Sequence, residues 1–273
     1  MKKFTLGIVQ ISSSESIEAN CKKAFSFIDQ CIDECGAELV VLPETVTTGF
    51  NPGISPEALA GLSRTQLPEW LDRAKNKAKE KGIYLTWPTY ESSEDSKAVF
   101  NTVYLISPSG DIVGKYRKTH LFPTERPENG GWSVAGNDTP VFDTPLGKIG
   151  IIICFDGDFP LLSMKLAEKG AQIILRPSAF LRSYDIWKLT NRARAYDNHV
   201  FVAGANCTGT DPSGTIYYGN SMIVSPTGQV LAHARGIEGV IYCDIDPQEL
   251  DKITFGSSEK RIFDHLKDQN PNI

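Results

Sequence analysis

The sequence has no long apolar run, no excess of positive charge and no pair of cysteines spaced as Cys-x-x-Cys. A membrane-spanning helix needs roughly 18–20 consecutive apolar residues, and no stretch of the chain reaches that length. The 28 Lys and Arg residues are outnumbered by 33 Asp and Glu residues, which gives a net charge of −5. Because sequence-independent binding of nucleic acid needs a basic surface, we expect neither a nucleic acid nor a membrane as a partner.

The cysteines do not form the dense pattern of a disulfide-stabilised domain. Six of them are spread over 273 residues, and Cys31 and Cys35 share one face of a predicted helix. This usage is typical of reduced thiols in a cytosolic protein and not of a metal site. We therefore expect a cytoplasmic location, and no motif for zinc, a nucleotide or a flavin predicts a cofactor.

The first residues imitate the start of a signal peptide. Met1-Lys2-Lys3 precedes an apolar run over residues 4–11, but this run is short, contains Gln10 and ends in three serines. No small-residue cleavage site follows it. We interpret residues 4–11 as a buried first strand.

The chain contains enough apolar material for a sizeable core, because 41% of its residues are hydrophobic and only 22% are charged. No linker rich in Gly or Ser divides it. We expect a single domain over residues 1–273, with the segment of about 247–273 as a candidate tail for contacts between subunits.

Short β-branched runs alternate with helical patterns along the chain. Apolar residues recur with helical spacing over residues 16–35, and Ser55-Pro56-Glu57 is a strong helix start before a pattern that continues to about residue 81. Further helices are predicted at 159–168 and 184–198. Strands are predicted at 38–42, 83–87, 101–107, 112–118, 148–154, 172–175, 199–205, 218–225 and 229–234.

The two halves of the chain resemble each other. Gly-Ala-Glu-Leu-Val-Val-Leu-Pro at 36–43 matches Gly-Ala-Gln-Ile-Ile-Leu-Arg-Pro at 170–177, a displacement of 134 residues for both the glycine and the proline. A Ser-Pro-x-Gly turn also occurs in each half, at 107–110 and 225–228. Two similar α/β halves indicate two sheets that pack face to face with helices outside.

Three reactive side chains stand at the ends of predicted strands: Glu44, Lys118 and Cys154. Backbone N–H groups and the dipole of the helix expected after Cys154 would favour its thiolate and could bind an oxyanion. Taken one at a time, each residue also has an ordinary interpretation. Glu44 could be an acid in a turn, Lys118 a solvated lysine and Cys154 an inert buried thiol.

Together the three segments resemble the carbon–nitrogen hydrolase (nitrilase) superfamily, in its amidase-like branch. Leu-Pro-Glu-Thr at 42–45, Tyr-Arg-Lys-Thr-His-Leu-Phe at 116–122 and Ile-Cys-Phe-Asp-Gly-Asp-Phe-Pro at 153–160 carry the resemblance, which extends over nearly the whole chain. It implies an α/β fold, a four-layer α-β-β-α sandwich with two pseudo-repeated halves. It also implies a homodimer or higher homo-oligomer.

The same residue types explain the chemistry of amide hydrolysis. Cys154 would attack the carbonyl carbon, and Glu44 would move protons between the thiol, the leaving ammonia and a water. Lys118 would stabilise the oxyanion together with backbone N–H groups around Phe155. The predicted function is a cysteine-dependent amidohydrolase that cleaves a small primary amide or carbamoyl compound through a thioester and releases ammonia.

The resemblance implies a second glutamate that holds the lysine and helps to position the substrate. Counting back from Cys154 favours Glu128, whereas counting forward from Lys118 allows Glu125. We choose Glu128. A Cys–His hydrolase is the alternative, and His120 lies nearest in sequence to Lys118, but none of the four histidines stands in a signature of such enzymes.

The substrate pocket is predicted from the residues after Cys154 and from nearby aromatic residues. Nitrilases proper usually carry Cys-Trp-Glu, whereas this chain has Cys154-Phe155-Asp156. Gly157 and Asp158 replace the arginines of carbamoylases that act on D-amino acids, and Asp158 would repel a nearby carboxylate. We expect a neutral or cationic amide in a pocket lined by Phe155, Gly157, Asp158, Trp132 and Phe180.

The sequence departs from the family pattern at two positions, and two alternative functions stay open. Leu161 and Met164 stand where the family normally has Glu and Arg, so we expect a change in helix packing or in an apolar surface beside the site. The alternative functions are a nitrilase, which would convert a nitrile to acid plus ammonia, and a non-catalytic homologue that binds ligands.

Overall fold

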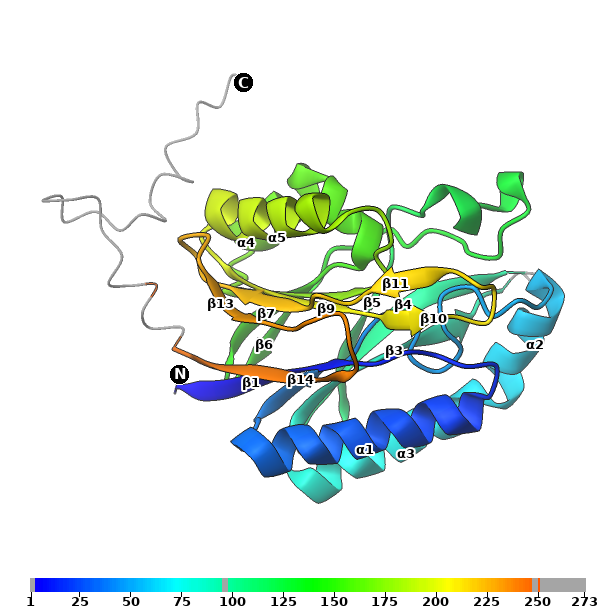
Figure 1. Cartoon of the computed structure of the whole chain (residues 1–273), viewed down its shortest axis with the longest axis horizontal. Helices are drawn as coiled ribbons and strands as arrows, with labels where there is room; N and C mark the ends of the chain where they lie inside the picture. Colours follow the sequence, from blue (N-terminus) through cyan, green and yellow to red (C-terminus); the bar gives the residue numbers. More distant parts are fainter. Residues whose placement is uncertain (1–2, 95–97, 247–249, 251–273) are drawn as a thin grey trace, which may run out of the picture.

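The chain forms two six-stranded β-sheets that pack face to face, with helices on the outer face of each sheet (Figure 1). The computed structural model describes residues 3–94, 98–246 and 250. The predicted α/β class and the sandwich of two sheets between helices are confirmed. The segment of about 247–273 that we predicted as a contact tail lies outside the described residues, apart from Leu250.

The first sheet is built mainly from the first half of the chain. In spatial order its strands are β14 (Gly239–Ile245), β1 (Phe4–Gln10), β2 (Leu39–Val41), β3 (Tyr84–Ser92), β4 (Val99–Ile106) and β5 (Ile112–Arg117). The second sheet has the order β13 (Val230–His233), β12 (Met222–Val224), β9 (Phe201–Asn206), β8 (Ile173–Ser178), β7 (Gly147–Ile151) and β6 (Val141–Thr144). A separate hairpin joins β10 (Thr208–Thr210) to β11 (Ile216–Tyr218).

The predicted repeat is visible in the topology. Strands β1, β2 and β3 are parallel neighbours in the first sheet, and β7, β8 and β9 are parallel neighbours in the second. Helices α1 (Ile17–Cys35) and α3 (Leu67–Lys81) connect the first set, and α4 (Pro160–Glu168) and α5 (Tyr184–Asn198) connect the second. In both halves a glycine in the left-handed region follows the first helix, at φ 65° for Gly36 and 92° for Gly170.

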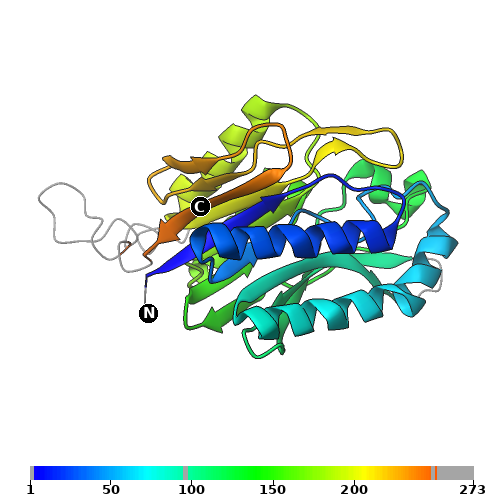
Figure 2. The ribbon, with the colours of Figure 1, turned by 60° about the horizontal axis from the view of Figure 1, so that its bottom comes forward.

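Helix α1 shows how the sequence specifies a helix on a sheet. The side chain of Ser16 accepts a hydrogen bond from the Ala19 N–H at the start of the helix. The apolar face holds Cys21, Ala24, Ile28 and Cys31, which are buried. Figure 2 shows α1 in blue and α3 in cyan side by side over the first sheet.

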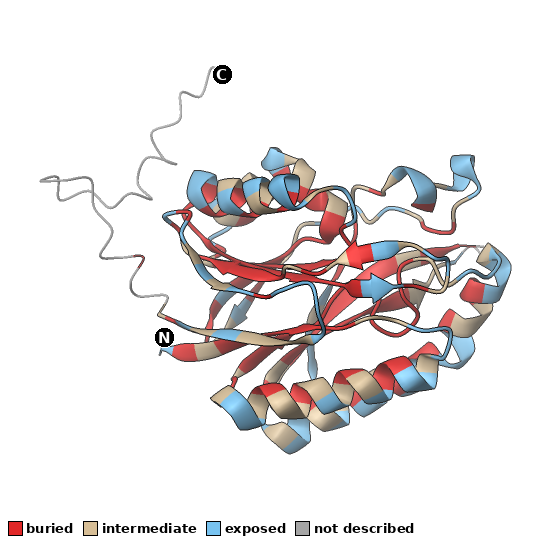
Figure 3. Cartoon of the chain, viewed as in Figure 1, coloured by how far each residue is buried: buried red, intermediate tan, exposed pale blue. Residues whose placement is uncertain are grey.

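The core lies mainly between the two sheets, where the strands are buried (Figure 3). Inward-facing residues of both sheets meet there, among them Leu6, Ile8, Val103, Ile149 and Ile173. Burial of these side chains is the main source of stability for a fold of this kind. Across the described residues, no helix combines the length and the apolar character that crossing a bilayer requires.

Some predicted boundaries were wrong. The single helix expected over residues 55–81 is two helices, α2 (Pro56–Thr65) and α3, because Pro68 lies in the first turn of a new helix and cannot continue the old one. The strand predicted at 148–154 ends as β7 at Ile151, three residues before Cys154. Strand β14 was not predicted, yet it pairs with β1 along its whole length.

Leu161 and Met164, the two residues that depart from the family pattern, lie on α4. The Leu161 side chain is 64% exposed and borders a surface depression with Phe159, His120 and Lys165. Leu161 is therefore exposed apolar surface, whereas its neighbour Leu162 is buried against the core.

Candidate active site

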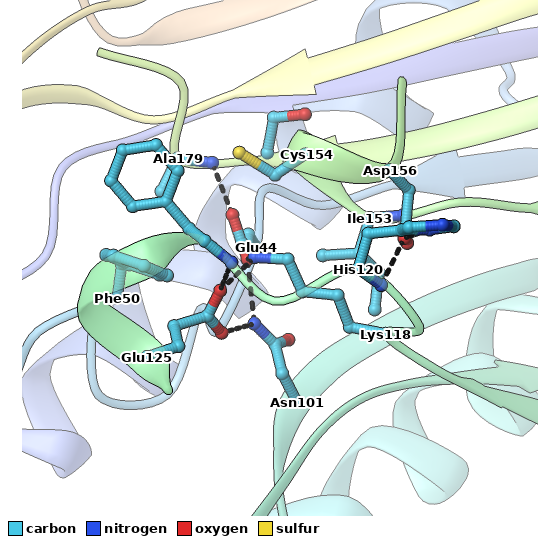
Figure 4. A network of polar contacts seen from close by, with 12 residues as sticks. Glu44, Phe50, Asn101, Lys118, His120, Glu125, Ile153, Cys154, Asp156 and Ala179 are labelled. Atoms are coloured by element: carbon cyan, nitrogen blue, oxygen red, sulfur yellow. Dashed lines mark hydrogen bonds and ion pairs between the residues drawn. The ribbon is translucent and has the colours of Figure 1, made fainter. Parts of the chain in front are cut away.

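The carboxylate of Glu44 lies where the two sheets meet at the carboxyl ends of their strands. Glu44 follows β2 by three residues and is 1% exposed. Its Oε1 accepts hydrogen bonds from Lys118 Nζ at 2.9 Å and from Asn101 Nδ2 at 2.7 Å (Figure 4). Its Oε2 accepts one from the Ala179 N–H at 2.8 Å. Donors from both sheets therefore fix the carboxylate in place.

Lys118 is a fully buried cation between two glutamates. It follows the last residue of β5, and its Nζ lies 2.9 Å from Glu44 Oε1 and 2.5 Å from Glu125 Oε2. Burial lowers the pKa of Lys118, but the carboxylates of Glu125 and Glu44 outweigh this effect and hold it well above the usual range. The side chain is therefore an ammonium ion at neutral pH.

The glutamate that contacts Lys118 is Glu125, and our choice of Glu128 was wrong on this point. A 3₁₀ turn at Pro123–Glu125 directs the Glu125 side chain back to Lys118, Asn101 and the Phe122 N–H. Burial raises the pKa of the Glu125 carboxyl, and Glu44 adds to this while Lys118 opposes it. Glu128 lies in the following turn, Pro127–Asn129, and its side chain is exposed.

Cys154 has an unusual backbone conformation. It follows Ile153 at the end of the β7 segment and begins the 3₁₀ turn Cys154–Asp158, with φ at 47°. A side chain in this left-handed region is strained, and such residues concentrate at functional sites. The Cys154 side chain points toward Ala179 and Glu44 (Figure 4).

The thiol of Cys154 is buried and its pKa is raised. Burial is the main cause and the Glu44 carboxylate adds to it, whereas Lys118 and Arg176 lower the pKa by smaller amounts. We expected nearby positive charge to favour the thiolate. Desolvation outweighs that charge, so the resting residue is a neutral thiol beside a carboxylate.

Asp156 links the Lys118 segment to the Cys154 turn. It is fully buried, and its carboxylate accepts hydrogen bonds from the Tyr116 hydroxyl, the His120 N–H and the Ile153 N–H. The His120 ring lies 3.0 Å from Asp156 and stacks on Phe159. His120 thus contacts Asp156, which gives no support to the Cys–His alternative.

A small apolar cavity opens onto Cys154. Phe155 and Phe180, two of the residues that we predicted for the pocket, lie on its wall. The other lining residues are Phe50, Phe122, Ala179, Leu181 and Arg182. Trp132 lies behind the wall: it packs on Phe50 and donates a hydrogen bond to the Tyr90 hydroxyl at 2.8 Å.

Gly157 and Asp158 do not line this cavity. A Cβ on Gly157 would lie 2.1 Å from the central carbon of the Arg176 guanidinium, so the space that glycine leaves is filled by Arg176. Asp158 forms an ion pair with Arg182. Asp158 therefore does not face the pocket, where we expected it to repel a carboxylate, and the charged side chain on the wall is Arg182.

The family model for carbon-nitrogen hydrolases matches residues 5–254. The chain belongs to the carbon–nitrogen hydrolase family. It is 33% identical over 263 residues to the omega-amidase NIT2 of Homo sapiens, covering 93% of this chain and 92% of the human protein. It is 32% identical over 283 residues to the deaminated glutathione amidase of Dictyostelium discoideum, covering 98% and 95%. An amidase from Nesterenkonia sp. shares the fold with a TM-score of 0.83 at 23% identity, covering 98% and 94%.

Sequence reasoning missed one contributor to this carbon–nitrogen hydrolase site. Asn101, in the middle of the buried sheet on β4, donates to both Glu44 and Glu125. The available signal was a polar amide at the start of a mostly apolar strand, because a buried amide needs partners. In the ranges that the structure describes, no group of three or more His, Cys, Asp or Glu side chains is arranged to hold a metal ion.

Proposed function

We propose that this carbon–nitrogen hydrolase cleaves the C–N bond of a small primary amide or carbamoyl compound, with Cys154 as the nucleophile. The observation that carries the proposal is the convergence of Glu44, Lys118 and Cys154, from three distant segments, beside one apolar cavity. The related omega-amidase and deaminated glutathione amidase act on amides, which supports the reaction class.

The first half of the reaction forms a thioester. Glu44 accepts the proton of the Cys154 thiol as the sulfur attacks the amide carbon. The C=O π electrons move to the oxygen, and Lys118 with nearby backbone N–H groups stabilises that oxyanion. When the C–N bond breaks, Glu44 returns the proton to the nitrogen and ammonia leaves.

The second half repeats the same proton movements with water. Glu44 removes a proton from water, whose oxygen attacks the thioester carbon. Collapse of the second tetrahedral intermediate breaks the C–S bond and releases the acid, and the thiol recovers its proton. A neutral resting thiol suits this scheme, because Glu44 must act as a base only when a substrate is in place.

Glu125 and Asn101 hold the reacting groups. Lys118 forms ion pairs with both Glu125 and Glu44. Because Glu125 takes part of this interaction, the ammonium does not pair with Glu44, the proposed base, alone. Asn101 donates to both carboxylates and keeps them at a fixed separation.

The cavity supports a small substrate with an apolar body. Four phenylalanines line it, and Arg182 is its charged wall residue. Since Asp158 is paired with Arg182 and does not line the cavity, it does not disfavour anionic amides. A panel of propionamide, the monoamide of succinic acid, N-carbamoylglycine and propionitrile compares neutral, anionic, carbamoyl and nitrile substrates.

We further propose one domain over the whole chain, a homodimer and a cytoplasmic location. Exposed apolar side chains on α4 and α5, namely Leu161, Leu189 and Tyr196, support an interface between subunits. All six cysteines are free thiols, which favours a reducing compartment.

Release of ammonia from the panel tests the proposed function, with Cys154→Ala as the blank. Intact-mass spectrometry during turnover should show a transient acyl adduct on the wild type and none on Cys154→Ala. Equal ammonia release by both proteins would reject the proposal. Faster release from propionitrile than from propionamide would assign a nitrilase, and a permanent adduct without release would assign a ligand-binding homologue.

A further inference from the structure

Arg176 is a fully buried arginine whose guanidinium lies against the backbone of Cys154. It is on β8, the strand parallel to β7, and none of its side chain is exposed. Its Nε and Nη2 both donate hydrogen bonds to the Cys154 carbonyl oxygen, at 3.0 and 2.7 Å. A charged donor that holds one oxygen with two nitrogens gives a strong and directional contact.

The remaining surface of the guanidinium is also held. Nη1 donates to Thr190 Oγ1 at 2.9 Å and to Asn191 Oδ1 at 3.0 Å, both on α5. The Trp187 ring lies 4.9 Å from the central carbon of the guanidinium. Its nearest carboxylate oxygen, on Asp158, is 3.9 Å away, beyond hydrogen-bond distance. The cation is therefore rigid, and its only paired hydrogen bonds to one acceptor go to Cys154.

Gly157 is what allows the guanidinium to occupy this place. A Cβ on Gly157 would lie 2.1, 2.3 and 2.4 Å from three atoms of the Arg176 guanidinium. Gly157 does not have a positive φ, so the glycine is required for space and not for an unusual backbone conformation. Arg176 and Gly157 form one structural unit although they are far apart in sequence.

We propose that Arg176 is a positioning residue that fixes the peptide group between Cys154 and Phe155, and with it both the nucleophile and an oxyanion donor. The inference rests on the proposed function. In a trans peptide the C=O and the following N–H point in opposite directions. Holding the Cys154 carbonyl on the α5 side therefore directs the Phe155 N–H to the other side of the peptide, away from Arg176.

The same contact explains how Cys154 keeps its left-handed conformation. A non-glycine residue at φ 47° persists only where the surroundings determine its backbone. Asp156 holds the Ile153 N–H on one side of Cys154, and Arg176 holds the Cys154 carbonyl on the other. The positive charge of Arg176 also acts on the thiol and lowers its pKa.

Two substitutions at Arg176 distinguish the effect of its positive charge from the effect of its paired hydrogen bonds. Arg176→Met removes both, whereas Arg176→Lys keeps a positive charge but loses the paired hydrogen bonds. The matched control is Arg194→Met. Arg194 is also almost buried and donates to a carbonyl of the same turn, that of Gly157, but it does not contact Cys154.

Two measurements report on the inference, the kcat for the panel amide that the wild type hydrolyses fastest and alkylation of Cys154 by iodoacetamide between pH 6 and 10. Alkylation is followed in a Cys35→Ala/Cys243→Ala background, which removes the two partly exposed cysteines. We expect Arg176→Met to lose roughly 10²-fold in kcat with little change in KM, the size of effect typical for a misplaced oxyanion donor. Its alkylation at pH 8 should be about tenfold slower, because a cation that favours the thiolate is gone.

Arg176→Lys should restore most of the alkylation rate but little of kcat. Gly157→Ala should lower kcat like Arg176→Met, because the methyl displaces the guanidinium, and the double variant Gly157→Ala/Arg176→Met should be no worse than Arg176→Met alone. If Arg176→Met does not fold, Arg176→Lys and Gly157→Ala carry the test. A kcat within threefold of the wild type for Arg176→Met, or an equal loss in Arg194→Met, would overturn the inference. Absence of ammonia release from every amide by the wild type would reject the proposed function, and the alkylation profiles would still decide the role of Arg176.

Discussion

Nζ of Lys118 lies 2.9 Å from Oε1 of Glu44, although the two residues are 74 positions apart and neither side chain is exposed to solvent. They come from the carboxyl ends of β5 and of the β2 segment, in the same sheet. A buried ion pair of this kind loses hydration on both partners and is weak evidence for stability. The position of this ion pair beside the Cys154 cavity is better explained by a role in the proposed reaction than by a contribution to stability.

Replacing Lys118 by Met should damage both stability and activity. The change leaves Glu44 and Glu125 buried without their cation, which is expected to lower the free energy of unfolding by about 3–5 kcal/mol. Urea denaturation measures this loss. Adding Glu125→Gln to Lys118→Met should recover part of the stability but no ammonia release, because the proposed oxyanion stabiliser is still missing. Recovery of activity in the double variant would contradict the role given to Lys118.

Glu125 and Glu128 should behave differently although they are three residues apart. Glu125→Gln removes one of the two carboxylates that hold Lys118, so the ammonium shifts toward Glu44 and weakens it as a base. We expect kcat to fall roughly 10²-fold. Glu128→Gln changes an exposed side chain and should retain the wild-type kcat. Steady-state kinetics on both variants make the comparison, and a larger loss in Glu128→Gln would restore our original choice.

The sequence was sufficient for features that depend on local pattern. The helix α1 was predicted from its apolar periodicity, and the repeat was predicted from two matching segments. Glu44, Lys118 and Cys154 were identified because each stands at the end of a predicted strand and their three segments together resemble the carbon–nitrogen hydrolase superfamily.

Features that depend on contacts between distant segments were not predictable. Whether Glu125 or Glu128 reaches Lys118 depends on how a proline-initiated turn folds back on β5. The role of Gly157 could not be read locally, because its missing side chain makes room for Arg176 on the neighbouring strand. The direction of the Cys154 pKa depended on the depth of burial, and sequence reasoning considered only the nearby charges.

Cys154 should be essential, whereas a second buried cysteine beside the site should not be. Cys154→Ala is expected to abolish ammonia release. Cys154→Ser should be nearly inactive, because a serine hydroxyl forms little alkoxide at neutral pH even with Glu44 as the base. Cys207 lies 3.8 Å from the Glu44 carbonyl oxygen and is the matched control. Cys207→Ala should retain most of kcat. Ammonia assays on the three variants, with thermal melts to confirm folding, test this distinction.

Glu44→Gln should move two properties of the site in opposite directions. Hydrolysis should fall roughly 10²–10⁴-fold, because the group that transfers protons is gone. The Glu44 carboxylate raises the pKa of the Cys154 thiol, so its neutralisation should lower that pKa and increase the thiolate fraction at any pH below it. Alkylation by iodoacetamide at pH 7–8 should therefore be faster in Glu44→Gln than in the wild type.

The control for Glu44→Gln is the wild-type alkylation profile. Since burial raises the pKa of Cys154, the wild-type rate should continue to rise through pH 8.5, the ordinary value for a thiol being about 8.5. A plateau below pH 7 would mean that the resting residue is already a thiolate, and Glu44 would then not be needed to remove its proton. Slower alkylation of Glu44→Gln, with hydrolysis lost, would instead make Glu44 the base that activates the thiol even toward a simple alkylating agent. If alkylation is faster and hydrolysis is lost, the two roles of Glu44 are distinguished. The faster alkylation then reports the effect of its charge on the Cys154 thiol, and the lost hydrolysis reports its proton transfer.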